Sequence, residues 1–286
     1  MRKRIVSILL VVIMLIGMMP LSVFAAGGAT GKYLDASGAP RDIPAADAIT
    51  TETTSLTAGW YTVSGEFEIN SRLSLSGGEV NIVLMDGSNL TVHGGIGLSN
   101  AETSLAIYAQ STGAGMGKLT VSDAEYGNAG IGADKSSSCG AITINGGSVT
   151  SGGEGGAGIG SGREGSCGAI TINGGSVTSG GEDGDAGIGS GREGSCDVIT
   201  INGGSVIALG GFGCAAIGAG YRGACNSITI SGGNITANGG TAYGVGIGCG
   251  SYGSCDAITI NGGVITANGV QWGQVLVLVK KAFAVL

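Results

Sequence analysis

The sequence predicts an all-β protein, a right-handed, single-stranded parallel β-helix (β-solenoid) with coils of about 29 residues. Glycine accounts for 61 of the 286 residues, and the motif Ile-Thr-Ile, followed by Asn or Ser and two glycines, recurs five times at nearly constant spacing. Each repeat also holds three short apolar pieces separated by glycine. Pieces this short pair stably only with their copies in neighbouring repeats, which gives three parallel sheets along one axis. Crossovers between parallel strands are right-handed in nearly all proteins.

The N-terminus has the features of an export signal. Basic residues at 2–4 precede an apolar run over 5–19, and small residues surround Ala25. We therefore predict a signal peptide over residues 1–25, cleaved after Ala25 or Ala26. The apolar run is shorter than the ~20 residues that span a bilayer. We expect a secreted, extracellular protein with no membrane contact after cleavage.

The mature chain divides into four segments. Residues 26–57 are polar with small side chains, and we expect a leader and an N-terminal cap, because a solenoid end exposes strand edges. Residues 58–139 alternate apolar and polar positions less regularly and predict irregular coils. Residues 140–269 carry the regular Cys- and Gly-rich repeats. Residues 270–286 are mostly apolar. They could be a tail or a C-terminal cap, or the sequence could be truncated here from a longer wall-anchored protein.

Stacking of the repeats explains the composition. Branched aliphatic residues lying about 4.8 Å apart fill a narrow core well. The predicted interior columns are Ile142/Ile170/Ile199/Ile228/Ile258, Ile144/Ile172/Ile201/Ile230/Ile260, Val149/Val177/Val206/Ile235/Ile265 and Ile131/Ile159/Ile188/Ile217/Ile247. At one corner Asn145, Asn173, Asn202 and Asn261 precede Gly-Gly, and we expect their amides to hydrogen-bond between coils. The glycines supply positive φ at the corners.

Charge and composition exclude several classes of protein. The formal net charge is −7 and the pI is about 4.6, which disfavours nucleic acid as a partner. An apolar content of 43% with only 12% charged residues excludes a highly charged disordered chain. The oligomeric state is left open by these features.

The repeats resemble those of a known group of proteins. The pattern Ile-Thr-Ile-Asn-Gly-Gly, Val-Thr, Gly-Gly, Ala-Gly-Ile-Gly is similar to the glycine-rich repeats of large secreted and surface proteins of gut Firmicutes. Residues 59–65 and 83–87 resemble the region that precedes those repeats, so that the resemblance spans about 55–269. Those proteins are adhesin-like, and related clostridial β-helix modules are described as carbohydrate-binding. The resemblance implies a non-catalytic cell-surface scaffold whose partner is a polysaccharide or a host or cell-wall glycan.

Five cysteines keep one position in the repeat. Their spacings are 28, 29, 29 and 30, and they are Cys139, Cys167, Cys196, Cys225 and Cys255. The column allows buried free thiols, disulfides between neighbouring coils such as Cys167–Cys196, or a metal site. Metal is the weakest of the three, because a C-x₂-C motif is missing and the single histidine, His93, lies far away in sequence. Cys214 and Cys249 fall elsewhere in the coil and have no obvious partner.

Aromatic residues gather in the turns of the last repeats. They are Phe212, Tyr221, Tyr243 and Tyr252. Flat aromatic faces suit the apolar faces of sugar rings, so these four residues are the predicted ligand-binding site. The alternative is surface decoration, because the same turns carry Arg and Glu residues that pair weakly across neighbouring coils.

One turn brings three carboxylates together in the sequence. Glu182, Asp183 and Asp185 lie between glycines and superficially resemble a calcium-binding repeat loop. The neighbouring repeats lack the Asp residues. Calcium is therefore only a candidate at these three positions, and no other cofactor is predicted.

A polysaccharide lyase or hydrolase of the pectate-lyase shape is the alternative from another functional class. Such chemistry needs paired carboxylates, or a calcium cluster with a basic residue. The acidic residues of the repeats recur with the repeat, whereas a catalytic site normally interrupts it with unique residues. His93 is a lone histidine in the sequence. We therefore predict that the protein is not an enzyme.

Overall fold

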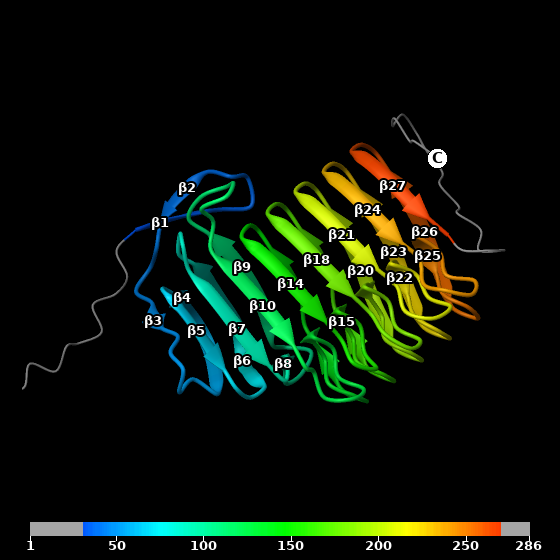
Figure 1. Ribbon diagram of the computed structural model, residues 1–286, viewed down its shortest axis with the longest axis horizontal. Coiled ribbons are helices and arrows are strands. Elements are labelled where there is room, and N and C mark those ends of the chain that lie inside the picture. Colours follow the sequence, from blue (N-terminus) through cyan, green and yellow to red (C-terminus); the bar gives the residue numbers. More distant parts are fainter. Residues whose placement is uncertain (1–30, 270–286) are drawn as a thin grey trace, which may run out of the picture.

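The computed structural model describes residues 31–269, which form strands and turns. The chain winds into an elongated stack of coils, with the N-terminal coils at one end and the C-terminal coils at the other (Figure 1). Within residues 31–269 no helix is long and apolar enough to cross a membrane. The predicted signal peptide (1–25) and the C-terminal tail or cap (270–286) lie outside the described residues.

One side of the solenoid is an eight-stranded sheet in which every pair of neighbours is parallel. Its strands are β5 (Glu66–Ile69), β7 (Asn89–His93), β10 (Lys118–Ser122), β14 (Ser148–Gly152), β18 (Ser176–Gly180), β21 (Ser205–Leu209), β24 (Asn234–Asn238) and β27 (Val264–Asn268). In Figure 1 this sheet faces the viewer and its strands run downward while the chain advances from left to right, which is the right-handed sense of coiling. The fold is the predicted parallel β-helix.

The other two sides share a single 17-stranded sheet, where the sequence predicted two separate sheets. The reason lies in β4 and β6, which run through the bend between the two sides without a break and hold them in one hydrogen-bonded network. The strands of this sheet are β3 (Asp47–Ala48), β4 (Ser55–Val63), β6 (Leu73–Leu84), β8 (Ile96–Leu98), β9 (Ser104–Ala109), β11 (Ile131–Gly132), β12 (Ser138–Cys139), β13 (Ile142–Ile144), β15 (Ile159–Gly160), β16 (Ser166–Cys167), β17 (Ile170–Ile172), β19 (Ile188–Gly189), β20 (Ser195–Ile201), β22 (Ile217–Ala219), β23 (Ala224–Ile230), β25 (Ile247–Cys249) and β26 (Ser254–Ile260).

The predicted interior columns lie in direct register. In the first column Ile142 pairs with Ile170, Ile170 with Ile199, Ile199 with Ile228 and Ile228 with Ile258. The other three columns stack in the same one-over-one manner. Their side chains are buried along the axis and form one continuous core. Hydrophobic burial of these stacked aliphatics is the main stabilisation of a coil that has no core of its own.

The asparagine corner forms the predicted amide ladder. Asn173 Nδ2 donates to Asn145 Oδ1, and Asn202 Nδ2 donates to Asn173 Oδ1, both at 2.8 Å. Ser231 takes the next position and has no amide to continue the ladder. The second glycine of each pair at this corner adopts positive φ, for example 83° at Gly175. Side-chain hydrogen bonds and permissive glycine backbone together fix the corner in each coil.

A second glycine column lies inside the third side of the solenoid rather than at a corner. Gly189 in β19 has a φ of 137° and pairs in register with Gly218 of the next coil. A Cβ atom at Gly189 would overlap the carbonyl group of Gly218. The column comprises Gly132, Gly160, Gly189, Gly218 and Gly248. Glycine is required here by the close approach of one coil to the next as well as by its dihedral angle.

The N-terminal segment combines a hairpin with the first strand of the solenoid. β1 (Lys32–Leu34) and β2 (Pro40–Asp42) pair antiparallel, and β3 pairs in parallel with β4. The Tyr33 ring packs against Trp60 and Tyr108 with centroids 5.0 and 4.8 Å away. Burial raises the pKa of Tyr108 to about 12. The hairpin thereby covers aromatic surface on the first coils, in the segment where the sequence predicted a cap.

Candidate functional site

Two turns of each C-terminal coil come close together because the strand between them is very short. β22 has only three residues, and Phe212 lies in the turn before it while Tyr221 lies in the turn after it. In the next coil Tyr243 and Tyr252 occupy the corresponding turns around β25. The backbone N–H of Ser251 donates to the carbonyl oxygen of Gly213 at 2.7 Å and ties turns of the two coils together.

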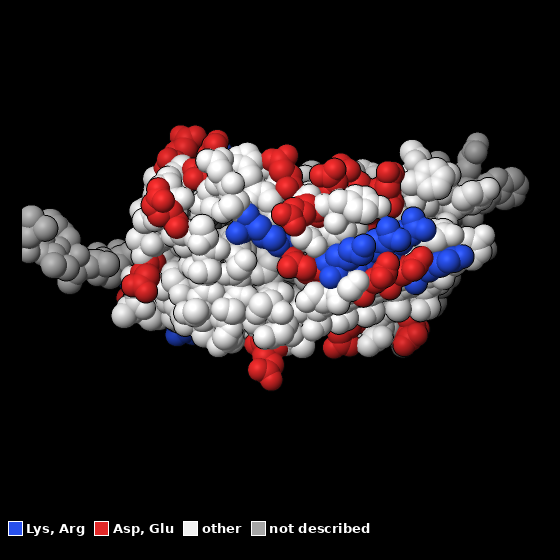
Figure 2. Space-filling view, turned by 90° about the horizontal axis from the view of Figure 1, so that it is seen from below, with Lys and Arg blue, Asp and Glu red and all other residues white. Residues whose placement is uncertain are grey.

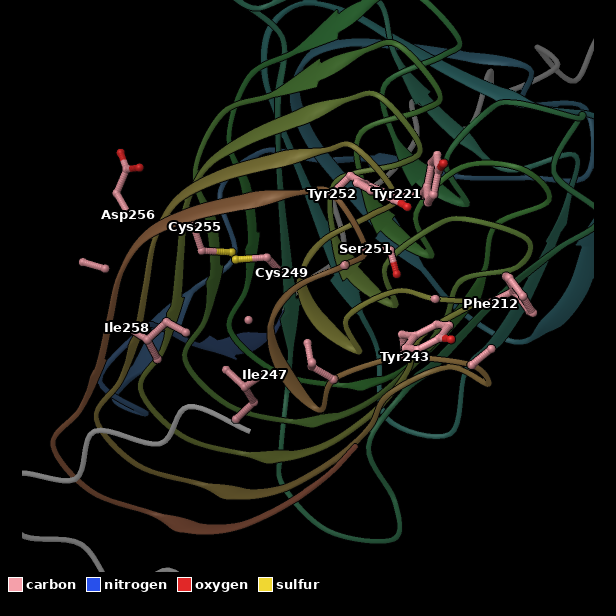
Figure 3. A pocket seen from close by; sticks show the side chains of 16 residues that line it. Phe212, Tyr221, Tyr243, Ile247, Cys249, Ser251, Tyr252, Cys255, Asp256 and Ile258 are labelled. Atoms are coloured by element: carbon pink, nitrogen blue, oxygen red, sulfur yellow. The ribbon is translucent and has the colours of Figure 1, made fainter. Parts of the chain in front are cut away.

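The four predicted aromatic residues line one hollow of about 910 Å³ (Figure 3). Tyr252 is 83% exposed, Phe212 59% and Tyr243 58%, while Tyr221 is half-buried. Apolar side chains of the last coil also reach the hollow. The structure thus brings together the four residues named from the sequence, and their role in ligand binding stays a prediction.

The backbone at this site is unusual. Ala242 and Tyr243 are consecutive residues with φ of 53° and 77°, and Tyr252 has a φ of 59°. A bulky residue with positive φ costs free energy that the surrounding structure must offset, and such residues cluster at functional sites. The φ of Tyr252 recurs at Glu164 and Glu193 of earlier coils and so belongs to the repeat. The strained pair at Ala242 and Tyr243 is specific to the last turn.

Arginine side chains pack against the rings of the site. Tyr221 and Tyr252 meet edge to face, with centroids 5.6 Å apart and an interplanar angle of 77°. The guanidinium carbons of Arg192 and Arg222 lie 5.2 and 5.3 Å from the centroid of Tyr221. Both arginines also approach Glu193, at 3.7 and 3.9 Å. Cation–π contacts of this kind attract the guanidinium groups to the face of the half-buried Tyr221 ring.

Charged side chains gather beside these turns. Figure 2 shows basic and acidic side chains interleaved in one band over the C-terminal half of this face. Arg163 and Glu164 form a further ion pair of the same column, at 3.3 Å. The surface next to the aromatic rings therefore offers both hydrogen-bond donors and acceptors.

The structure does not bring the three candidate calcium ligands together. Asp185 is fully buried, and its Oδ1 accepts a hydrogen bond from the backbone N–H of Arg192 at 2.7 Å. Glu182 and Asp183 are exposed and lie outside this buried position. Over residues 31–269 no group of three or more His, Cys, Asp or Glu side chains could hold a metal ion. The carboxylate of Asp185 is used to fix its own turn, and burial raises its pKa to about 7.

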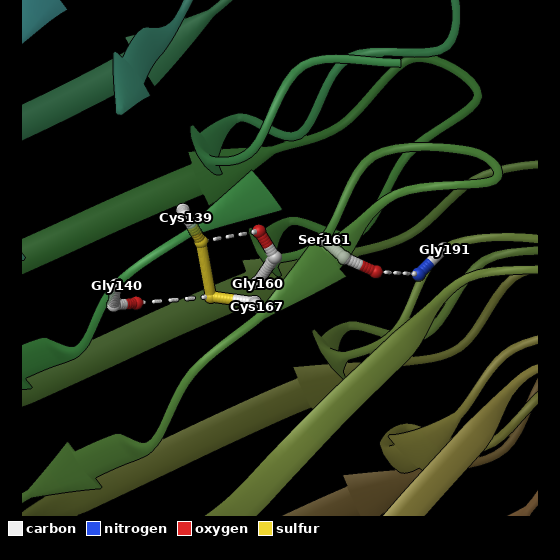
Figure 4. Close-up of a disulfide and its surroundings, with 6 residues drawn as sticks. All are labelled: Cys139, Gly140, Gly160, Ser161, Cys167 and Gly191. Carbon is white, nitrogen blue, oxygen red and sulfur yellow. Dashed lines mark hydrogen bonds between the residues drawn. A yellow bond between two sulfur atoms is a disulfide. The ribbon is translucent and has the colours of Figure 1, made fainter. Parts of the chain in front are cut away.

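The cysteine column contains one disulfide. Cys139 of β12 and Cys167 of β16 are bonded, with their Cα atoms 4.7 Å apart (Figure 4). Cys196, Cys225 and Cys255 continue the column in register as free thiols. A bond between neighbouring coils was one of the three predicted alternatives, but the pair differs from the example Cys167–Cys196, because Cys167 is already bonded to Cys139.

A cluster around His93 was missed by the sequence analysis. His93 Nδ1 donates to Asp123 Oδ2 at 2.7 Å, and the Ser122 hydroxyl donates to the same carboxylate at 2.8 Å. Glu68 lies 3.6 Å from the other ring nitrogen. The hydrogen bond to Asp123 raises the pKa of His93. The register of β7 and β10, which pairs Ser122 with His93, is the signal that could have revealed this cluster, but these coils lack a clear repeat.

Ser122 and Asp123 both approach the same nitrogen of His93, with the Ser122 oxygen 3.2 Å from Nδ1. A serine nucleophile with a histidine base needs the hydroxyl on one ring nitrogen and the orienting carboxylate on the other. The cluster lacks that arrangement. It is an exposed ion pair with one additional hydroxyl.

Comparison with known proteins bears on the regular coils. A family described as "Beta helix repeat" matches residues 142–163, 170–192, 199–221, 228–251 and 258–273. The five matches begin at the five isoleucines of the first interior column, so the family repeat and the coil of the structure coincide. The regular coils are β-helix repeats. No curated protein and no solved structure matches the chain significantly.

Proposed function

We propose that the β-helix repeat protein is a secreted, non-catalytic, adhesin-like scaffold at the cell surface that binds polysaccharide through Phe212, Tyr221, Tyr243 and Tyr252. One observation carries the proposal. Aromatic side chains from two successive coils surround a single hollow, and three of them are more than half exposed. Exposed apolar clusters cost solubility, and they mark interaction sites on proteins of this kind.

The chemistry of the hollow suits sugar rings. Aromatic faces pack against the C–H faces of pyranoses, and the nearby guanidinium and carboxylate groups can exchange hydrogen bonds with hydroxyl groups. Tyr221 and Tyr252 occupy corresponding turns of adjacent coils, one strand spacing of about 4.8 Å apart along the axis. Two neighbouring rings spaced along the solenoid axis favour an extended glycan chain over a compact ligand.

Secretion rests on the basic residues and the apolar run of the first 25 positions. An exported protein meets host and cell-wall glycans, which agrees with the chemistry of the hollow. The single disulfide of the cysteine column is also typical of proteins that fold outside the cytoplasm.

The competing function is a polysaccharide lyase or hydrolase, and the His93 cluster is the observation that would favour it. General acid and base catalysis of glycosidic cleavage requires two groups that flank the scissile bond. In the cluster Asp123 forms a hydrogen-bonded ion pair with His93. The two groups therefore contact each other, and no space for a scissile bond lies between them. The cluster also belongs to β7 and β10, several coils before the aromatic hollow. We therefore favour binding over catalysis.

A double substitution tests the aromatic hollow. In the Tyr243→Ala/Tyr252→Ala variant we expect affinity for the bound polysaccharide to fall about fivefold or more, because two ring contacts of ~0.5–1.5 kcal/mol each are lost. The measurement is retention on polysaccharide gels during native electrophoresis, with circular dichroism to compare the folds.

Tyr126→Ala is the matched control. Tyr126 is also an exposed tyrosine, at 65%, but it lies outside the hollow and several coils away. Retention of this variant should equal that of the unmodified protein. Equal retention of the double variant and the control would contradict the proposed site.

A further inference from the structure

The cysteine column has an odd number of members, which leaves one thiol over at its end. Cys139 and Cys167 are bonded, and Cys196 pairs in register with Cys225 in the next coil. Cys255 is then the last member of the column. Its side chain lies beside that of Cys249, a residue outside the column. Figure 3 shows the sulfur atoms of Cys249 and Cys255 pointing toward each other at the edge of the hollow.

Cys249 occupies a position that fixes turns in two of the earlier coils. It follows Ile247 and Gly248, and its equivalents are Ser161, Ser190 and Ala219. Ser161 Oγ accepts a hydrogen bond from the backbone N–H of Gly191 at 3.1 Å (Figure 4). Ser190 makes the same bond to Gly220 at 3.0 Å. The last described coil carries cysteine both here and in the column, a combination that none of the earlier coils has.

We propose that Cys249 and Cys255 form a disulfide that closes the turn carrying Ser251 and Tyr252, and so holds Tyr252 in place at the aromatic hollow. The second half of this inference rests on the proposed function, because it concerns the same hollow. The first half, formation of the bond, stands on the position of the two sulfur atoms alone.

Accessibility distinguishes this pair from the other free thiols. Cys249 and Cys255 are half-buried and line the hollow, so a dissolved disulfide reagent can reach them. Cys196, Cys225 and Cys214 are buried, with exposed fractions of 2%, 1% and 0%. We expect the pair at the hollow to be oxidised before the buried thiols.

The reaction is thiol–disulfide exchange with a small-molecule disulfide such as oxidised glutathione. The hydrogen bond from Cys255 lowers the pKa of Cys249, so Cys249 is the thiolate that attacks a sulfur of the reagent. This forms a mixed disulfide and releases one glutathione. Cys255 then loses its proton and attacks the sulfur of Cys249, which closes the protein bond and releases the second glutathione. Two protein thiols are oxidised and one reagent disulfide is reduced.

Closing the turn affects ligand binding through conformational freedom. Only five residues lie between the two cysteines, and Tyr252 is among them at 83% exposure. A short covalent loop restricts the conformations of the turn before the ligand binds. The turn therefore loses less conformational entropy on binding. Immobilising one such side chain changes affinity by about twofold to tenfold. We expect a loss of that size on reduction.

Peptide mapping of the full chain tests the bond itself. The protein is treated with oxidised glutathione, alkylated and digested with chymotrypsin under non-reducing conditions. Cleavage after Tyr252 separates the two cysteines, so their peptides stay together only if the disulfide has formed. We expect a linked pair containing Cys249 and Cys255. If these peptides appear separately and alkylated while the Cys139–Cys167 pair is linked, the proposal is overturned.

Single substitutions test the effect on the hollow. Cys249→Ser should leave Cys255 open to alkylation, lower affinity for the polysaccharide probe about twofold to tenfold, and abolish the response to reduction. The matched control is Cys214→Ser, a buried thiol that does not line the hollow, and it should retain the response. A linked pair whose reduction leaves affinity unchanged would overturn the role at the hollow. Failure to bind polysaccharide in either redox state would overturn the proposed function, while the mapping would still decide the disulfide.

Discussion

In the Gly189→Ala variant, the free energy of unfolding is expected to fall by about 3 kcal/mol or more. Gly189 has a φ of 137°, a conformation that residues with a side chain rarely adopt. Its added methyl group would also overlap the backbone carbonyl of Gly218 in the next coil, which cannot move without disturbing the ladder. Denaturant unfolding followed by circular dichroism measures the loss.

Gly180→Ala is the matched control for this prediction. Gly180 lies at the end of β18 in the same coil, and a Cβ atom there would have open space around it. Its φ is outside the positive region, so the substitution should change stability by less than about 1 kcal/mol. If both variants unfold at the same denaturant concentration, the result would contradict the close approach of Gly189 to the next coil.

In the Asp185→Asn variant, stability at pH 8 is expected to rise by about 3–4 kcal/mol relative to the unmodified protein. Burial raises the pKa of Asp185 to about 7 in the folded state, whereas its ordinary value is 3.8. The folded state therefore holds a proton that the unfolded state has already lost, and stability falls as the pH rises from about 4 to 7. Asparagine keeps the acceptor oxygen for the Arg192 N–H and has no charge to bury.

Another coil already contains this asparagine. Asn128 occupies the equivalent position, and its Oδ1 accepts a hydrogen bond from the backbone N–H of Lys135 at 2.8 Å. The measurement is the free energy of unfolding at several pH values between 4 and 8, with Asp183→Asn as a control in the same turn. The free energies of unfolding of the unmodified protein and of the Asp185→Asn variant should be equal near pH 4 and differ increasingly toward pH 8. Parallel curves would contradict a buried, protonated Asp185.

Much of the fold follows from the sequence because a solenoid repeats the same coil structure along its axis. The spacing of the isoleucines placed Ile170 over Ile142 and Ile199 over Ile170, and the structure has that register. The asparagine corner followed from the same spacing. The merging of two sides into one sheet could not be predicted, because it depends on β4 and β6 in coils that have no clear repeat.

The candidate site was predicted only in part. Aromatic residues that recur in the turns of neighbouring repeats necessarily come together, so Tyr221 and Tyr252 could be grouped from sequence. The sequence made the turn at Asp185 a calcium candidate, because it does not reveal that the carboxylate accepts a hydrogen bond from the backbone N–H of Arg192. The contact of Cys249 with Cys255 depends on how the chain bends between β25 and β26, which the spacing of the repeat does not specify.

Polysaccharide binding without cleavage is the central claim, and one experiment measures both parts of it. The purified full chain is incubated with a panel of acidic and neutral polysaccharides, and bound protein and released sugar are quantified in the same samples. We predict retention on at least one polysaccharide, with no new reducing ends and no absorbance from unsaturated products. Release of oligosaccharides by the unmodified protein, abolished in a His93→Ala variant, would contradict the account and establish the enzyme in its place.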